Sequence, residues 1–269
     1  MIISASRRTD IPAFYSDWFF NRIKEGYVLV RNPMNIHQVS KIKLSPDVVD
    51  CIVFWTKNPK PMLDKLDELK DYRYYFQFTL NSYSNDIEPN VPSKSEEIIN
   101  TFKQLSDLIG RDRVIWRYDP IILSEKYTVQ YHIKYFEKLS QILNGSFNKC
   151  VISFVDFYKK NARTLNGINH GKCIDDKLIE QLCGCRISAN KDKNQRDICG
   201  CIESIDIGLY NTCMHKCKYC YANYSLKTVD DNYAKYNPNS PLLCSELLIE
   251  DKIIERNVKS LIDDQLTMW

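Results

Sequence analysis

Short runs of β-branched and aromatic residues recur along the first 165 residues and alternate with segments of helical periodicity. The runs are almost continuously apolar instead of alternating with polar positions, which is typical of strands buried on both faces of a parallel sheet. Six such strands are predicted: Ile2–Ser6, Tyr27–Arg31, Cys51–Thr56, Arg73–Leu80, Arg113–Tyr118 and Cys150–Asp156.

Helical segments between these strands have recognisable starts. Ser16 is placed to cap a helix over Asp17–Lys24, and Pro61 lies in the first turn of another that runs to about Lys70. Two further helices follow from apolar residues at helical spacing, namely Ile98, Phe102, Leu105 and Ile109, and then Val129, Ile133, Phe136 and Leu143 after Thr128. This alternation predicts an α/β fold, either a (β/α) TIM-like barrel or a partial barrel.

The composition changes after residue 165, where cysteines and polar residues become frequent. A short helix is predicted over Ile174–Leu182 and a strand over Ile202–Ile207, and Leu242–Leu266 has the pattern of a long amphipathic helix or a pair of helices. We therefore expect residues 1–165 to form the barrel core. Residues 166–269 are expected to be a cysteine-rich, cluster-binding segment that completes the same domain.

Charged side chains follow several predicted strands at their carboxyl ends, where parallel barrels place their chemistry. The candidates for binding an anion are Arg7, Arg8, Arg31 and Arg117. Their expected partners, which are also candidate proton-transfer groups, are Asp10, Asp119 and Asp156. Such a rim predicts a pocket for a small anionic substrate that carries carboxylate, phosphate or sugar groups.

Charge and hydropathy narrow the class of protein. The net charge is +3, from 37 basic and 34 acidic side chains, which is too balanced to predict a nucleic-acid partner by itself. No apolar run approaches the ~20 residues of a membrane span, so no membrane partner is predicted. The first residues lack the charged, apolar and small-residue order of a signal peptide. These features predict a cytoplasmic protein.

The distribution of the eleven cysteines points to metal binding or catalysis. A reducing cytoplasm disfavours disulfides, and nine of the cysteines lie between Cys173 and Cys244. Cys51 and Cys150 lie inside predicted strands and are interpreted as small buried apolar residues. The clustered set is therefore interpreted mainly as ligands, with Cys244 as a packing residue.

Cys213, Cys217 and Cys220 have the spacing C-x3-C-x2-C. Three thiolates on one short loop can hold three irons of a [4Fe–4S] cluster and leave the fourth iron open to a small ligand. A structural zinc site would need a fourth ligand, from His215, Cys199 or Cys201. An electron-transfer cluster would need a fourth cysteine at ferredoxin-like spacing, which is absent locally. The open cluster is favoured, with zinc and electron transfer as alternatives.

The segment CMHKCKYC resembles the motif of radical-SAM enzymes, with the aromatic Tyr219 before the third cysteine. Its extension into CYANY is similar to the spore photoproduct lyase branch. Most of the chain also resembles a bacterial family, domain of unknown function 1848. The segments that carry this second resemblance are SRRTDIPAFY, VDCIVFWTKNP, YYFQFTLN, RVIWRYDPI, CVISFVDFYKK, HGKCID, KDKNQR and CGCIESIDIG.

The radical-SAM resemblance implies that Cys213, Cys217 and Cys220 ligate the cluster and that Tyr219 contributes to cofactor binding. It also implies that S-adenosylmethionine binds the open iron and is reduced by an external electron donor to give a 5′-deoxyadenosyl radical. No glycine-glycine-glutamate segment follows the triplet, unlike in typical members. Because the triplet lies late in the chain, Ile202–Ile207 is expected to replace the cluster-bearing first strand in a permuted order.

Two further interpretations remain open. The pairs Cys183/Cys185 and Cys199/Cys201 predict a second iron–sulfur cluster or a zinc ion, with free thiols as the alternative. A non-enzymatic binding protein, stabilised by zinc or a cluster, is the second functional hypothesis. Nucleic acid is the partner then considered, with phosphate and stacking contacts from Lys191, Lys193, Arg196, Tyr219, Tyr221 and Tyr224.

Overall fold

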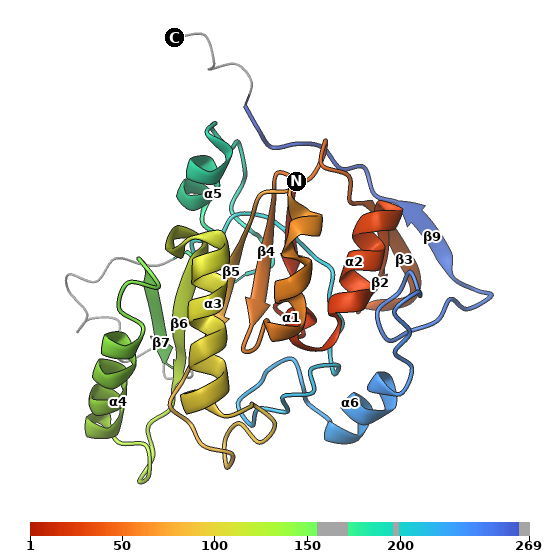
Figure 1. Ribbon diagram of the computed structural model, residues 1–269. Helices are drawn as coiled ribbons and strands as arrows, with labels where there is room; N and C mark the ends of the chain where they lie inside the picture. Colours follow the sequence, from red (N-terminus) through yellow and green to blue (C-terminus); the bar gives the residue numbers. More distant parts are fainter. Residues whose placement is uncertain (155–171, 196–198, 264–269) are drawn as a thin grey trace.

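The computed structural model describes residues 1–154, 172–195 and 199–263. Its centre is a six-stranded parallel sheet in the spatial order β7-β6-β5-β4-β1-β8 (Figure 1). The strands are β1 (Ile2–Ala5), β4 (Cys51–Thr56), β5 (Tyr74–Thr79), β6 (Val114–Ile121), β7 (Cys150–Phe154) and β8 (Ile205–Asp206). Five of the six predicted strands of the first half therefore pair as expected, and β8 confirms the strand predicted before the cysteine triplet.

The apolar runs are continuous because both faces of the sheet are buried. On β4, Phe54 packs into one hydrophobic core and Val53 into the other. The first core also takes Trp116 of β6, and the second takes Tyr75 of β5. Successive side chains of a strand point to opposite faces, so each strand contributes to both cores.

Helices cover one face of the sheet, and residues 173–189 and 199–202 pack on the other (Figure 1). On the first face lie α1 (Ile11–Phe14), α2 (Ser16–Glu25), the 3₁₀ helix η1 (Lys60–Leu69), the π-helical turn η2 (Lys94–Ile98), α3 (Ile99–Ile109) and α4 (Val129–Ile142). A short 3₁₀ turn, η3 (Arg111–Arg113), precedes β6. Ile179 of α5 (Asp176–Cys183) packs on the second face.

The predicted cap at Thr128 is confirmed, but the one at Ser16 is wrong. Ser16 is the first residue of α2, after the N-cap Tyr15, and its hydroxyl donates to the Pro61 carbonyl at 3.1 Å. The Thr128 side chain accepts a hydrogen bond from the amide of Tyr131, and the Asp175 side chain accepts one from the amide of Lys177. The segment that begins near Pro61 forms a 3₁₀ helix instead of an α-helix.

A second, three-stranded sheet corrects the position of the predicted strand Tyr27–Arg31. This strand, β2 (Tyr27–Asn32), forms an antiparallel hairpin with β3 (Asn35–Lys43), and β9 (Lys252–Glu255) adds to β3 in parallel. Only two residues separate β2 from β3, which permits a hairpin but not the long crossover that a parallel partner needs.

The predicted α/β class is confirmed, and one more expectation is corrected. Among the described residues β7 and β8 are the two ends of the central sheet, so the described strands form an open parallel sheet, and a barrel or partial barrel stays a prediction. The predicted helical tail instead contains β9, and residues 264–269 lie outside the described part. Up to residue 263, the last helix is α6 (Leu226–Tyr233).

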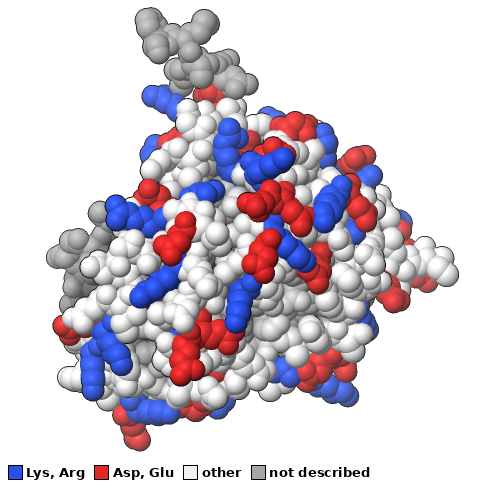
Figure 2. Space-filling view, viewed as in Figure 1, with Lys and Arg blue, Asp and Glu red and all other residues white. Residues whose placement is uncertain are grey.

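Surface charge is mixed on the face that the helices occupy. Figure 2 shows Lys and Arg interspersed with Asp and Glu over this face, without a broad patch of one sign. Within the described ranges, no helix is both long and apolar enough to cross a membrane.

Candidate functional site

At the carboxyl ends of β5, β6 and β7, several polar side chains form one hydrogen-bonded network. The Arg117 guanidinium of β6 donates to Asp119 and, at 2.9 Å, to the Cys173 sulfur. Asp119 also accepts a hydrogen bond from Ser153 of β7, and Asn81 donates to its carbonyl at 2.8 Å. Burial opposes ionisation of Asp119, but Arg117 and Ser153 outweigh burial and lower the pKa of this carboxyl. The structure thus places Arg117 and Asp119 side by side at this edge.

Trp55 at the end of β4 carries two guanidinium groups over its indole ring. The Arg7 carbon Cζ lies 5.6 Å from the ring centroid, and that of Arg117 lies 5.2 Å away. Arg7 is also 3.4 Å from a carboxylate oxygen of Asp192 and donates to Ser204 at 3.3 Å. Stacking and ion pairing together fix two cations beside the carboxyl edge of the sheet.

The Asp206 carboxylate of β8 binds the chain that leaves β1. It accepts hydrogen bonds from the hydroxyls of Ser4 at 2.8 Å and Ser6 at 2.6 Å, and from the Arg7 amide at 2.8 Å. Arg8 lies 3.9 Å from the same carboxylate. Arg7 and Arg8 are therefore positioned by β8, the strand that precedes the cysteine triplet.

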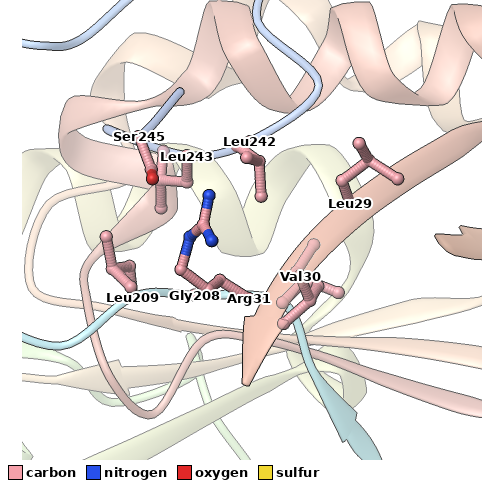
Figure 3. A pocket seen from close by; sticks show the side chains of 9 residues that line it. Leu29, Val30, Arg31, Gly208, Leu209, Leu242, Leu243 and Ser245 are labelled. Carbon is pink, nitrogen blue, oxygen red and sulfur yellow. The ribbon is translucent and has the colours of Figure 1, made fainter. Parts of the chain in front are cut away.

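One predicted rim residue, Arg31, does not join this group. Arg31 lies in the antiparallel sheet, where its guanidinium is paired with Asp251 at 2.6 and 2.7 Å and donates to the carbonyl of Glu246 at 2.7 Å. Figure 3 shows Arg31 in a small pocket lined by residues of β2, the chain after β8 and the segment near Leu242. Asp156 lies outside the described residues.

The loop that carries the three cysteines lies against this edge of the sheet. The ring nitrogen Nε2 of His215 is 2.9 Å from the Asp10 carboxylate, and this histidine side chain is only 2% exposed. Asp10 also accepts the amide of Lys57 at 2.7 Å and caps α1 through the amide of Ala13. His215, one of the candidates for a fourth zinc ligand, is thus buried against Asp10.

The segment Ile87–Asn90 holds the cysteine loop from the other side. The Lys218 amide donates to the Ile87 carbonyl at 3.0 Å, and the Asn90 side chain donates to the Met214 carbonyl at 2.8 Å. These two hydrogen bonds hold the loop at Met214 and at Lys218. The conformation of the loop is consequently set by residues far away in the sequence.

A buried carboxylate, Glu88, lies beneath the loop with two lysines. Lys57 is 2.7 Å from one oxygen, Lys94 binds the other, and the Tyr219 hydroxyl donates to Glu88. Burial acts against ionisation of Glu88, but the two lysines prevail and lower its pKa to about 2. Lys57 is also electrostatically coupled to Cys217, whose thiolate it favours. The loop therefore meets fixed charges at Tyr219 and Cys217.

The thiols of Cys213, Cys217 and Cys220 influence one another. Burial raises the pKa of Cys213, and Asp10 and the other two thiols raise it further. Burial also raises the pKa of Cys217, to about 11, although Lys57 opposes the shift. Across residues 1–154, 172–195 and 199–263, no three His, Cys, Asp or Glu side chains are gathered as ligands of a single metal ion. A four-iron cluster needs a wider arrangement because each thiolate binds a different iron.

The remaining predicted ligands fall into two groups with different neighbours. Cys201 accepts hydrogen bonds at its sulfur from the amides of Cys173 at 3.3 Å and Ile174 at 3.4 Å, and Cys199 lies beside it. The hydrogen bond with the Cys173 thiol is the main cause that lowers the pKa of Cys201 to about 7.

Cys183 and Cys185 lie beside each other near the amino ends of the strands. The Cys183 thiol is 3.6 Å from the Asp50 carbonyl, and it adds to the effect of burial in raising the pKa of Cys51. Burial raises the pKa of Cys183 to about 12. A second metal site on Cys183, Cys185, Cys199 and Cys201 remains a prediction.

Sequence reasoning missed the residues that hold the cysteine loop. Glu88 and Lys94 lie in a polar stretch without a periodic pattern, and no pattern within the predicted strand Ile202–Ile207 singled out Asp206. Only Lys57, which follows a predicted strand at the rim, carried a signal that pointed to the site.

Comparison with known proteins identifies the family. A family model described as "Domain of unknown function (DUF1848)" matches residues 2–167 and 161–222. The chain therefore belongs to this family. No curated protein and no solved structure matches the chain significantly.

Proposed function

We propose that the chain is an iron–sulfur enzyme of the radical-SAM type. In this proposal Cys213, Cys217 and Cys220 hold a [4Fe–4S] cluster, and S-adenosylmethionine binds the open iron. The observation that carries the proposal is the position of the cysteine loop, which follows β8 and lies over the charged carboxyl edge of a six-stranded parallel sheet.

The order of the strands supports a permuted partial barrel. In space, β8 is followed by β1, β4, β5, β6 and β7, so the cysteine loop follows the first strand of the series. The chain after β8 then returns to the start of β1, where the Met1 amino group donates to the Lys259 carbonyl at 2.7 Å. This return replaces the crossover that would join β8 to β1 in the unpermuted order.

The residues around the loop fit such a cluster. Three thiols share one short loop and are coupled to one another, and the cation of Lys57 favours the thiolate of Cys217. Asp10 and Glu88 hold His215 and Tyr219, which fixes the loop on either side of Cys217. The protein thus supplies a preorganised set of soft ligands, as iron–sulfur clusters require.

Each group at the edge has a role in the proposal. Arg7, Arg8 and Arg117 bind and orient an anionic substrate, and Asp119 is the candidate to hold or transfer a proton. Tyr219 presents its aromatic ring next to the third cysteine and contributes to cofactor binding. When bound, the cluster supplies one-electron reduction of S-adenosylmethionine, with the electron from an external donor.

Iron and acid-labile sulfide in anaerobically isolated and reconstituted protein test the proposal. Wild type is expected to contain about four of each per chain. Cys213→Ala, Cys217→Ala and Cys220→Ala should each lose most of both, while Cys150→Ala on β7 should retain them. Adding S-adenosylmethionine to the reduced protein should change its EPR spectrum and release 5′-deoxyadenosine. Equal iron content in all four variants would contradict the proposal.

Two exposed tyrosines favour the second candidate function, binding of single-stranded nucleic acid. Tyr221 and Tyr224, directly after the triplet, are 69% and 75% exposed, so their rings are available for stacking. Lys191 and Lys193 are the candidate phosphate contacts, whereas Arg196 lies outside the described residues. This hypothesis predicts bound zinc without sulfide, and nucleic-acid binding that weakens with salt. Salt-independent binding, or none, would exclude it.

A further inference from the structure

The strand β9 forms an open edge of the smaller sheet. The strands of this sheet have the order β2-β3-β9, so among the described residues no strand pairs with the outer side of β9. Figure 1 shows β9 at the periphery of the molecule, away from the central sheet. All four of its residues are exposed. An open edge strand is a template to which another chain can add through backbone hydrogen bonds.

The pairing of β9 with β3 determines which backbone groups face outward. The Arg256 amide, directly after β9, donates to the Lys41 carbonyl of β3 at 2.9 Å. Successive residues of a strand direct their amides and carbonyls to alternate edges. The backbone groups of Ile253 and Glu255 therefore point away from β3. These two residues offer hydrogen-bond donors and acceptors at the outer edge of the sheet.

Large apolar side chains lie exposed on and beside this edge. Ile253 and Ile254 are 49% and 51% exposed, and Ile249, in the turn before β9, is fully exposed. The turn is held by the Asp251 carboxylate, which is paired with Arg31 at 2.6 and 2.7 Å. A group of exposed apolar side chains next to an open strand edge is typical of a protein interface.

We propose that two copies of the chain associate through their β9 strands, in antiparallel pairing about a two-fold axis at Ile253. Ile253 then exchanges two backbone hydrogen bonds with the partner's Ile253, and the two three-stranded sheets become one continuous sheet. In this register Glu250 lies opposite the partner's Arg256, and Arg256 lies opposite the partner's Glu250. Both side chains are exposed, so each dimer gains two ion pairs at the ends of the paired strands.

The charges of β9 select this register over its neighbours. Opposite residues of antiparallel strands share a face, so a two-fold axis must place one residue opposite its own copy. An axis at Ile254 would put Lys252 opposite the partner's Arg256. An axis at Lys252 or at Glu255 would put that charged side chain opposite itself. Each of these three registers brings like charges together, which is destabilising, whereas the axis at Ile253 places opposite charges at both ends.

One pair in the proposed register joins two acidic residues. Glu255 lies opposite the partner's Asp251. The Asp251 carboxylate, however, is turned toward Arg31 of its own chain and is almost fully buried, so its charge is already compensated. Glu255 is exposed and can extend into solvent. The charge pattern of β9 therefore fits a second copy of the chain, and this inference does not depend on the proposed cluster.

Sedimentation velocity of the full chain at increasing protein concentration tests the association. The mass should rise from that of one chain to that of two and no further, because a two-fold pair of edge strands is closed. A chain that stays monomeric up to its solubility limit would overturn the proposal. Larger assemblies that grow with concentration would overturn it as well, since they require a second surface.

Charge reversal tests the register. Glu250→Arg and Arg256→Glu should each raise the dissociation constant about tenfold, because two attractive pairs become repulsive. The double variant should regain the wild-type constant. An equal mixture of the two single variants should form a heterodimer, because one chain is then positive at both positions and the other is negative at both. Within one chain the two positions are about 20 Å apart along the strand, too far to compensate each other.

Glu125→Arg is the matched control, since it changes the net charge as Glu250→Arg does. Glu125 is exposed in the loop before α4, on the other side of the molecule from β9 (Figure 1). This variant should dimerise like wild type. A dimer that survives both single reversals, or one that the double variant and the mixture fail to restore, is not formed through this register, and the proposal is then wrong.

Hydrogen exchange on the wild type needs no variant and so remains decisive should any variant fold poorly. The outward amides of Ile253 and Glu255 should exchange rapidly in dilute protein. The Ile253 amide should become protected as the dimer forms. The Arg256 amide, which is bonded to Lys41 within one chain, should change little. Dimerisation that leaves the exchange of Ile253 unaltered would place the interface elsewhere and overturn the proposal.

Discussion

The Asp10 carboxylate lies 2.9 Å from the Nε2 atom of His215, 205 residues later in the chain. Both side chains are almost fully buried. The contact joins the loop after β1 to the cysteine loop after β8, the two neighbouring strands at one end of the sheet. Asp10 therefore links the start of the fold to the conformation of the triplet.

Asp10→Ala is expected to lower the free energy of unfolding by about 3 kcal/mol, because several buried donors lose their acceptor at once. These donors are His215 and the amides of Lys57 and Ala13. Urea unfolding of both proteins measures the change. Asp17→Ala removes an exposed ion pair with Lys65 and should cost about 0.5 kcal/mol or less. Equal losses in the two variants would contradict the role of Asp10.

Acid should destabilise the protein through Glu88. Its pKa is about 2 in the folded protein, below the ordinary value of 4.5, so its contribution is present above pH 4.5 and is lost as pH falls toward 2. The shift corresponds to about 3 kcal/mol at neutral pH. Unfolding free energies measured across this range should therefore fall steeply in wild type. Glu88→Gln should flatten that fall, whereas Glu97→Gln, at the surface, should leave it unchanged.

The strands of the central sheet were predictable because each run between Ile2 and Phe154 is buried on two faces and reads as continuously apolar. The hairpin of β2 and β3 was not, since the turn at Pro33 and Met34 has no glycine and so lacks the usual hairpin signal. The tail was misjudged for a related reason. A short apolar stretch such as Ile253–Ile254 fits a strand as well as a helix, and only pairing with β3 decides between them.

The residues of the candidate site also differ in how far local sequence patterns could predict them. Arg117 and Asp119 follow a strand in sequence, so a general rule on parallel sheets placed them at the edge. Glu88 could not be found in this way, because its link to Tyr219 spans 131 residues and arises only when the loop after β5 meets the cysteine loop. Local patterns predict strand ends well, but contacts between two irregular loops depend on the assembled fold.

Tyr15→Phe should make the start of the cysteine loop, next to Thr212, less rigid. The Tyr15 hydroxyl is buried and donates to the Thr212 carbonyl at 2.5 Å, directly before Cys213. Removing it leaves a buried carbonyl without this donor, for an expected cost of about 1 kcal/mol. Tyr72→Phe removes a similar hydrogen bond to the Leu44 carbonyl at 2.7 Å, near the amino ends of the strands and so at the end of the sheet opposite the triplet.

Both tyrosine variants should lose similar stability in urea, but only Tyr15→Phe should release iron to a chelator faster than wild type. Iron release that is equal in the two variants would show that Thr212 does not control the loop. If Tyr15→Phe loses stability but the wild type contains no iron, the hydrogen bond from Tyr15 to Thr212 is supported and the proposed cluster is contradicted.

Gly208→Ala should disrupt the junction of β1 and β8. A methyl group at this position would lie 2.6 Å from the Ser6 Cβ and 3.2 Å from the Thr9 Cγ2, closer than side-chain carbons pack. Ser6 cannot retreat without losing its hydrogen bond of 2.6 Å to Asp206. The expected cost is about 2 kcal/mol, typical of overpacking in a tight core.

Gly200→Ala is the matched control for this substitution. Its new methyl group would meet the Lys172 side chain at 3.1 Å, which is flexible and can move aside. Thermal unfolding should therefore show a clear decrease in melting temperature for Gly208→Ala and little change for Gly200→Ala. If both variants melt like wild type, Ser6 has room to move. Close packing between β8 and the loop after β1 would then not be the cause of the fixed position of Asp206.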